Sequence, residues 1–317
     1  KYERFECLNS KQWTDAFDVK IHRTLLIDPA ERCLYFATSM LHDADQQREA
    51  PGGKVVRYDP MRREYRVLGA PLPHLYIQSI AADWTRGLLY GFTYPAEFLF
   101  LLDIRTGAAE TLAYVGNAIS FAQPHNAVVD SEGWLWGTYA ETRAWDETTG
   151  TTPVRLFKFH PDGRRFEWFE HGLARRDRPA EFAETRHKQD HGFCDSMLYD
   201  GRRYIYAGST AGVLSRIDTR TAAVEKVAEA METGRFPALA LRDGQLYGGG
   251  GIQGRTELVR IDLASGRLDH FDRLEDPDIG DRPARIHEIA VDAEHRLYLG
   301  ENDNHERSGY LWSAWLG

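Results

Sequence analysis

Two histidines, His22 and His42, flank the segment IHRTLLIDPAERCLYFATSMLH, which is typical of two short strands joined by a turn. An antiparallel pairing of these strands would bring both rings to the same open end of the hairpin. Imidazole titrates near neutral pH, so two imidazoles that face one substrate can serve as general base and general acid. The segment therefore predicts a proton-transfer site, with the order of acid and base left open.

Other polar side chains occupy equivalent strand ends further along the chain. Arg155 offers a planar fork that matches a carboxylate, and Tyr139 is a candidate second acid. Each of these residues taken alone is as readily a structural residue that orders water. Taken together they predict a concave site with substrate contacts from Gln78, Tyr94, His125, His191 and His287.

A repeat explains why these side chains would share a face. Each unit opens with a five-residue run that closes on Asp, and an aromatic strand follows after a short turn. A third and usually a fourth short strand complete the unit, at a pitch of about fifty residues. Four strands per unit at this pitch predict the blades of a β-propeller, in which strand ends converge on one face. The opening runs are TLLID, SIAAD, NAVVD, SMLYD, LALRD and EIAVD.

Six units are visible, and we expect one closed all-β domain over residues 1–317. The last unit has three clear strands, so the N-terminal YERFECL is expected to supply the missing outer strand and close the ring. The third unit is long, with extra residues at 140–153 and 171–194, where a seventh, degenerate blade has room. Within it, residues 174–188 are expected to form a charged, solvated loop.

Composition restricts the partners. The chain has 317 residues, a formal charge of −9 and a pI near 5.8, which argues against nucleic acid or an anionic membrane as a partner. An acidic oligosaccharide or polysaccharide remains compatible if the site has a local basic group. We find neither an apolar run of membrane length nor a signal peptide in the chain as given, and a leader already removed would imply a secreted or periplasmic protein. Cys7, Cys33 and Cys194 are expected to be buried thiols.

Two weaker signals complete the survey. His187, His191 and Cys194 have spacings compatible with a metal, so a structural metal ion remains possible, while the expected chemistry requires no cofactor. The run YGGGGIQG at 247–254 lacks the Lys-Ser/Thr of a phosphate loop. Its glycines indicate a close backbone approach or a bulge.

Several runs carry a resemblance to a known superfamily. HRTLLIDPAERCLYFATSMLH, GGKVVRYDP, PHNAVVDSEGWLWG and IHEIAVDAEHRLYLGEND resemble the propeller superfamily that contains ulvan lyases, rhamnose–glucuronate lyases and a related α-L-rhamnosidase family. The resemblance implies seven blades. It also implies that the histidine pair carries the chemistry, assisted by a tyrosine and an arginine spaced as Tyr139 and Arg155 are here.

The resemblance implies a lyase that acts on a glycan with uronic acid. Such an enzyme neutralises the C6 carboxylate, removes the C5 proton and protonates the departing oxygen. We expect Arg155 to bind the carboxylate, with Arg23 the nearest alternative in sequence, and His22 and His42 to move protons. A glycoside hydrolase and a non-catalytic glycan- or protein-binding propeller remain alternatives. A metal-dependent lactonase is a more distant one, indicated only by Asp195 and Asn302.

Overall fold

The computed structural model describes ten stretches of the chain, and all regular structure within them is β-strand. It covers residues 20–39, 48–116, 126–140, 154–177, 193–232, 234–252, 255–271, 274–276, 278–302 and 309–316. The chain divides into two compact units, residues 1–118 and 119–317, and each unit is described by itself. None of the described residues forms a helix long and apolar enough to span a membrane.

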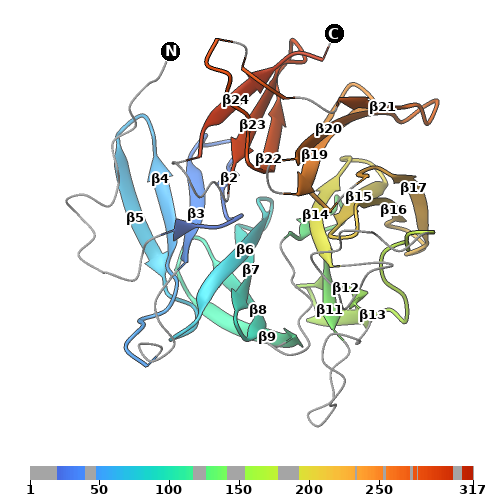
Figure 1. Cartoon of the computed structure of the whole chain (residues 1–317). Coiled ribbons are helices and arrows are strands. Elements are labelled where there is room, and N and C mark those ends of the chain that lie inside the picture. Colours follow the sequence, from blue (N-terminus) through green and yellow to red (C-terminus); the bar gives the residue numbers. More distant parts are fainter. Residues whose placement is uncertain are drawn as a thin grey trace. The chain divides into compact units, whose positions relative to one another are not determined.

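The first unit contains two antiparallel sheets. One contains β1 (Lys20–Ile21), β2 (Leu26–Ile27), β3 (Leu34–Ser39), β4 (Val55–Asp59) and β5 (Glu64–Gly69), with β1 and β2 both paired to β3. The other has β6 (Tyr76–Asp83), β7 (Leu88–Tyr94), β8 (Glu97–Asp103) and β9 (Ala109–Gly116) in chain order, and these strands lie side by side in Figure 1.

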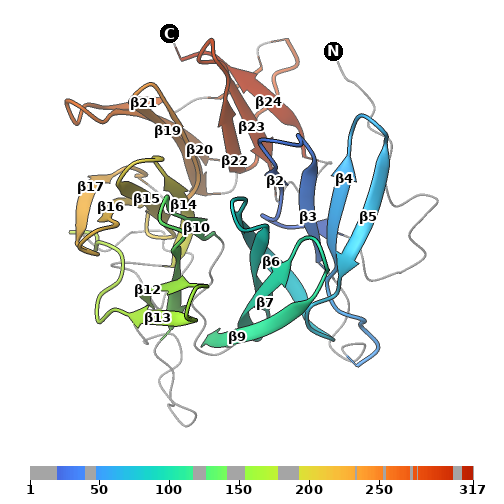
Figure 2. The same cartoon turned by 180° about the vertical axis from the view of Figure 1, so that it is seen from behind.

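The second unit contains four antiparallel sheets, each again in chain order. Its first sheet has β10 (Val128–Val129), β11 (Leu135–Ala140), β12 (Val154–His160) and β13 (Arg165–Trp168), and its second has β14 (Cys194–Tyr199), β15 (Tyr204–Ser209), β16 (Val213–Asp218) and β17 (Val224–Glu229). Its third has β18 (Arg235–Arg242), β19 (Gln245–Ile252), β20 (Arg255–Asp262) and β21 (Leu268–Phe271), and its last has β22 (Ile286–Val291), β23 (Leu297–Glu301) and β24 (Leu311–Ala314). Figure 2 shows β22, β23 and β24 in red from behind.

The aspartates of the repeat explain the hairpins. The carboxylate of Asp28 accepts the amide of Ala30 at 2.8 Å, directly after β2. Asp200 repeats this after β14, where its carboxylate accepts the amides of Arg202 and Tyr204 at 2.8 and 3.0 Å. An aspartate that accepts amides two to four residues ahead closes a tight turn. The repeated Asp is therefore a folding residue in these two sheets, and Asp83, Asp130 and Asp292 accept amides in the same way in three others.

Apolar side chains fill the space between consecutive sheets of the same unit. In the second unit, Trp136 and Leu156 of the first sheet pack with Ile205 and Ala207 of the second. Phe236, the second residue of β18 in the third sheet, packs with Leu214 of the second. Face-to-face packing of alternating strand residues buries one face of each sheet against the next. The first unit has the same kind of core, with Ile77, Leu89 and Phe100 among its members.

The glycine run lies within β19 and serves packing. A Cβ at Gly248 would stand 2.1 Å from Cε2 of Phe236, and one at Gly250 would stand 2.1 Å from the carbonyl oxygen of Arg235. Both distances are far below van der Waals contact, so these positions require glycine. The expectation of a close backbone approach is confirmed.

Six sheets in the described part of the chain confirm the six repeats, and the seventh blade implied by the resemblance is not among them. The N-terminal YERFECL and the extra residues 141–153 and 178–192 lie outside the described residues, so the predicted closing strand stays a prediction. Cys33 and Cys194 are buried thiols, as expected, and Cys7 lies outside the described residues.

Candidate functional site

The first strand of the first sheet is interrupted where His22 stands. Between β1 and β2 the hydroxyl of Thr24 replaces the backbone hydrogen bonds to β3. It donates to the carbonyl of Ala37 at 2.8 Å and accepts the amide of Ala37 at 3.1 Å. Arg23 adopts a φ of 42° in this break. Because the backbone turns out of the ladder here, His22 is directed toward the next sheet instead of toward its own neighbours.

The ring of His22 has a defined tautomer. Its Nδ1 lies 3.0 Å from the carbonyl oxygen of Gln78 in β6. A carbonyl oxygen can only accept, so Nδ1 carries the hydrogen and, in the neutral ring, Nε2 carries the lone pair. His22 is therefore oriented as a proton acceptor through Nε2.

Gln78 occupies a β-bulge. The pairing of β6 with β7 shifts between Ile77 and Ser79, which leaves Gln78 as the extra residue. Its side chain is 2% exposed, and among the described residues its Oε1 has no hydrogen-bond partner. Burying an amide oxygen without a hydrogen-bond donor costs folding free energy. This atom is therefore suited to accept a hydrogen bond from a ligand hydroxyl.

Tyr94 lies at the same end of this sheet. It pairs in register with Tyr76, and the two ring centroids are 5.3 Å apart. Burial, reinforced by the charge of Glu97, raises the pKa of Tyr94 above its ordinary value. The phenol therefore stays protonated near neutral pH and can donate a hydrogen bond. His42 and His125 lie outside the described residues, so their predicted places beside these groups stay predictions.

In the second unit, Asp195 is held by Arg235. The carboxylate accepts Nε of Arg235 at 2.8 Å and Nη2 through its other oxygen. The Asp195 side chain is 0% exposed and that of Arg235 is 11% exposed, so this is a buried, two-point ion pair. Asn126 joins the group by donating from Nδ2 to the backbone carbonyl of Asp195 at 3.2 Å.

His287 is also buried, at the start of β22, and has the opposite tautomer from His22. Nδ2 of Asn302 lies 3.2 Å from Nδ1 of His287. The amide nitrogen donates, so Nδ1 accepts and the neutral ring carries its hydrogen on Nε2. His287 is therefore oriented as a hydrogen-bond donor. This contact joins His287, a predicted substrate contact, to Asn302, directly after the neighbouring strand β23.

Three inner strands place a polar, buried residue in the same kind of bulge. Such bulges redirect a side chain and are frequent next to active sites. The pairing shifts between Cys194 and Ser196 and between Ile286 and Glu288, as it does around Gln78. The bulged residues are Gln78, Asp195 and His287.

Tyr139 and Arg155 are direct register partners on β11 and β12. The Tyr139 hydroxyl donates to the carbonyl of Phe169 at 3.1 Å, and Arg155 forms an ion pair with Glu170. The structure thus brings this predicted pair together. It also gives Arg155 a carboxylate of the chain itself, which the sequence did not predict.

The metal expectation finds no support among the described residues. No group of three or more histidine, cysteine, aspartate or glutamate side chains there is arranged to hold a metal ion. The thiol of Cys194 lies 3.5 Å from the carbonyl oxygen of Ser196. His187 and His191 lie outside the described residues. The two residues that indicated a lactonase have partners within the chain, since Asp195 pairs with Arg235 and Asn302 with His287.

Arg235 is the residue that sequence reasoning missed. It stands at the first position of β18, ahead of the run LALRD. The pairing of β18 with β19 also shifts here, between Arg235 and Ala238. This bulge displaces Arg235 from the spacing of the repeat, so counting back from the closing aspartate does not find it.

Comparisons with known proteins indicate the fold. No protein-family model matches the chain, and no curated protein matches its sequence. The β-propeller domain of Cps50 (Swd1) from Myceliophthora thermophila is similar, with a TM-score of 0.59 and 14% identity over 94% of this chain and 85% of that one. A luciferin-regenerating enzyme is similar with a TM-score of 0.55 and 12% identity, over 95% of this chain and 93% of that one.

A third similar structure is longer than this chain. It is the extracellular domain of a protein assigned as a one-component system in B. thetaiotaomicron, with a TM-score of 0.58 and 14% identity. The match covers 92% of this chain and 33% of that one, so the chain spans about a third of its length. At these identities the likeness shows the fold alone. The fold of the chain is that of a β-propeller, with the six described sheets as its blades.

Proposed function

We propose that the chain is a lyase that cleaves an acidic, uronic-acid-containing glycan by β-elimination. The observation that supports this most directly is the hydrogen bond of 3.0 Å from His22 Nδ1 to the carbonyl of Gln78. It fixes the ring and leaves Nε2 of the neutral imidazole with the lone pair that a general base needs. A histidine with this tautomer is suited to remove a carbon-bound proton at neutral pH.

The proposed step balances without a cofactor. Nε2 of His22 takes the C5 proton, the electron pair of that C–H bond forms the C4–C5 double bond, and the C4–O bond breaks. The leaving oxygen takes a proton from a general acid, for which His42 is the candidate that the sequence supplies. The C6 carboxylate and the role of second acid are assigned from the sequence to Arg155 and Tyr139. Neither nucleic acid nor a membrane enters the proposal.

Gln78 supports a substrate-binding role for the same end of the first unit. Its backbone carbonyl orients His22, and its buried amide oxygen lacks a donor among the described residues. A sugar hydroxyl next to the proton acceptor would satisfy that atom. One residue would thus orient the base and position the substrate.

The structural neighbours do not decide the chemistry. One is a luciferin-regenerating enzyme at 12% identity, and another is the extracellular domain of a protein assigned as a one-component system at 14% identity. A hydrolase and a binding module on the same fold are therefore outcomes of the experiment below. They are not separate proposals.

The experiment measures ultraviolet absorbance of the unsaturated uronate that a lyase releases from rhamnose–glucuronate oligosaccharides and other uronate glycans. We expect His22→Ala to lower kcat by ~10²–10⁴, the usual contribution of a general base. His160→Ala is the matched control. His160 is the last residue of β12, at the end of the strand away from Arg155. Saturated products would favour the hydrolase. Retained turnover in His22→Ala would remove His22 from the chemistry, and an inactive wild type would favour the binding module.

A further inference from the structure

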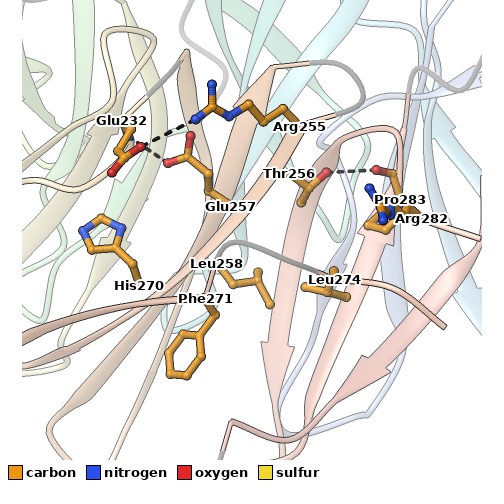
Figure 3. Close-up of a pocket in the computed structure, with 10 residues that line it drawn as sticks. All are labelled: Glu232, Arg255, Thr256, Glu257, Leu258, His270, Phe271, Leu274, Arg282 and Pro283. Carbon is orange, nitrogen blue, oxygen red and sulfur yellow. Dashed lines mark hydrogen bonds and ion pairs between the residues drawn. The ribbon is translucent and has the colours of Figure 1, made fainter. Parts of the chain in front are cut away.

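The second unit contains a cavity of about 480 Å³ apart from the residues discussed so far. It lies where β20 begins and β21 ends, and the segment that leads to β22 forms another wall. Figure 3 shows the ten side chains that line it. This volume is in the range of small-molecule sites. The lining residues are Glu232, Arg255, Thr256, Glu257, Leu258, His270, Phe271, Leu274, Arg282 and Pro283.

One part of the cavity is polar. Arg255 and Glu257 alternate along β20 and so share one face of the sheet, and the pairing of Val259 with His270 places His270 on that face. Figure 3 shows these three side chains gathered with Glu232 at one side of the cavity. Two carboxylates, a guanidinium and an imidazole thus converge from β20, β21 and Glu232, which lies three positions before β18.

Glu257 gives this polar part a fixed anchor. The residue is 6% exposed, and its Oε2 accepts the backbone amide of Glu232 at 2.8 Å. Glu257 is thus a carboxylate with a fixed position that borders the cavity. Arg255 is held more loosely, with Nη2 3.7 Å from Oε2 of Glu232, beyond hydrogen-bonding distance. A ligand can therefore engage Arg255 without breaking a tight ion pair.

The other part combines an apolar surface with a second cation. Leu258 and Phe271 are register partners and share the opposite face of the sheet, and Leu274 lines the cavity beside them. The hydroxyl of Thr256 donates to the carbonyl of Pro283 at 2.9 Å, which ties the wall before β22 to β20. Arg282 lines this wall and is hydrogen-bonded to Glu275 at 2.9 and 2.6 Å.

We propose that this cavity binds a neutral sugar ring. Its charged lining residues are two arginines and two glutamates, so the site favours neither a strong anion nor a strong cation. Hydroxyl groups both donate and accept, which suits a site that offers carboxylates, guanidinium groups and an imidazole together. The C–H face of a pyranose would lie against Phe271 and Leu274, which are only partly buried. The site is separate from His22 and holds whether or not the chain is a lyase.

The test is saturation-transfer NMR on the full chain, with L-rhamnose, D-glucose and D-galactose as separate probes and sodium D-glucuronate as the charged comparison. We expect transfer to at least one neutral sugar and weaker transfer to glucuronate. Glu257→Gln should weaken the binding of that neutral sugar about tenfold or more, because the variant loses a charged hydrogen-bond acceptor. Glu64→Gln, an exposed change in β5, is the matched control and should leave binding unchanged.

Arg255→Ala is the second variant. Its side chain is 58% exposed, so the fold does not depend on it, and it should weaken the same sugar. The proposal is overturned if no neutral sugar receives saturation, if glucuronate binds more tightly than the neutral sugars, or if both variants bind as the wild type does. None of these outcomes requires turnover, so they are distinguishable from a failure of the lyase proposal.

Discussion

Tyr139 and Arg155, sixteen positions apart in sequence, are direct partners across β11 and β12. Both are anchored to the residues that follow β13. The ring centroids of Tyr139 and Trp168 are 4.8 Å apart in an edge-to-face arrangement, and the Tyr139 hydroxyl donates to the carbonyl of Phe169. Arg155 forms an ion pair with Glu170. The two functional groups therefore share one support, and a change at Glu170 acts on Arg155 first.

This arrangement gives a test of the role of Arg155. A substrate carboxylate and Glu170 would compete for the same guanidinium fork. Glu170→Gln should therefore lower the KM for an acidic glycan, whereas Arg155→Lys should raise KM and lower kcat, because the bidentate fork is lost. Steady-state kinetics on a uronate oligosaccharide measure both effects. Glu167→Gln is the control, because it removes the ion-pair partner of Lys158, which lies on β12 with Arg155. Unchanged kinetics in both variants would move the carboxylate to another residue, with Arg23 next.

Removing either partner of the buried ion pair between Asp195 and Arg235 should strongly destabilise the second unit. Asp195→Asn leaves a buried guanidinium without its charge partner, so we expect a loss of roughly 3–5 kcal/mol in the free energy of unfolding. Urea unfolding followed by tryptophan fluorescence measures it. Asp218→Asn removes the partner of a more exposed arginine, Arg203, and should cost much less. Equal losses of unfolding free energy in Asp195→Asn and Asp218→Asn would contradict the argument that burial of the Asp195–Arg235 pair makes its disruption more costly.

Gly248 should not tolerate alanine. The added Cβ would stand 2.1 Å from the ring of Phe236, which is fully buried, so we expect a destabilisation of ~1–3 kcal/mol. Phe236→Leu in the same chain should recover part of that loss relative to the sum of the single changes, since the ring no longer occupies the space. Gly300→Ala in β23 is the control, because its Cβ would meet its nearest neighbour at 3.4 Å. Thermal unfolding measures all four variants, and additive losses in the double variant would refute the steric account.

Asp262 should make stability depend on pH in the acid range. Hydrogen bonds from the backbone and hydroxyl of Ser265, followed by one from Gln245, lower the pKa of Asp262 from 3.8 to about 2. The lowered pKa means that its stabilisation is complete above the ordinary value and is lost as the pH falls through about 2. The difference in unfolding free energy between wild type and Asp262→Ala should therefore be constant above about pH 5 and shrink toward pH 2.

Urea unfolding at stepped pH measures this difference. Asp278→Ala, at an exposed aspartate outside the strands, is the control. A difference between wild type and Asp262→Ala that persisted unchanged to the lowest pH would show that the turn does not depend on the charge.

The sequence predicted the blades well because turns are local. Asp59, Asp103 and Asp218 each accept an amide two or three residues ahead, so the residues that close a turn lie beside each other in the chain. The repeat that opens with SIAAD has its predicted fourth strand in β9, Ala109–Gly116. Short-range chemistry of this kind can be recognised without a structure.

The candidate site was less predictable because its geometry depends on register. His22 stands in a break of the strand that Thr24 bridges, and a simple hairpin does not reveal this break. The bulge at the start of β18 displaces Arg235 from the count of the repeat. Glu170 meets Arg155 only because β13 folds back along β12. These relationships link segments through tertiary pairing, which a pattern of residue types does not encode.

In the sheets that begin with β6, β14 and β22, the aspartate turn and the bulge lie at opposite ends of the first strand. Asp200 closes the end of β14 that leads to β15, whereas the bulge at Asp195 lies at the beginning of β14. Residues that close the hairpins are thus kept apart from the bulged residues. A mutant library at Gln78 and His287, which leaves the Asp195–Arg235 ion pair intact, would vary the bulged ends while sparing the hairpins, so these two positions suit directed evolution.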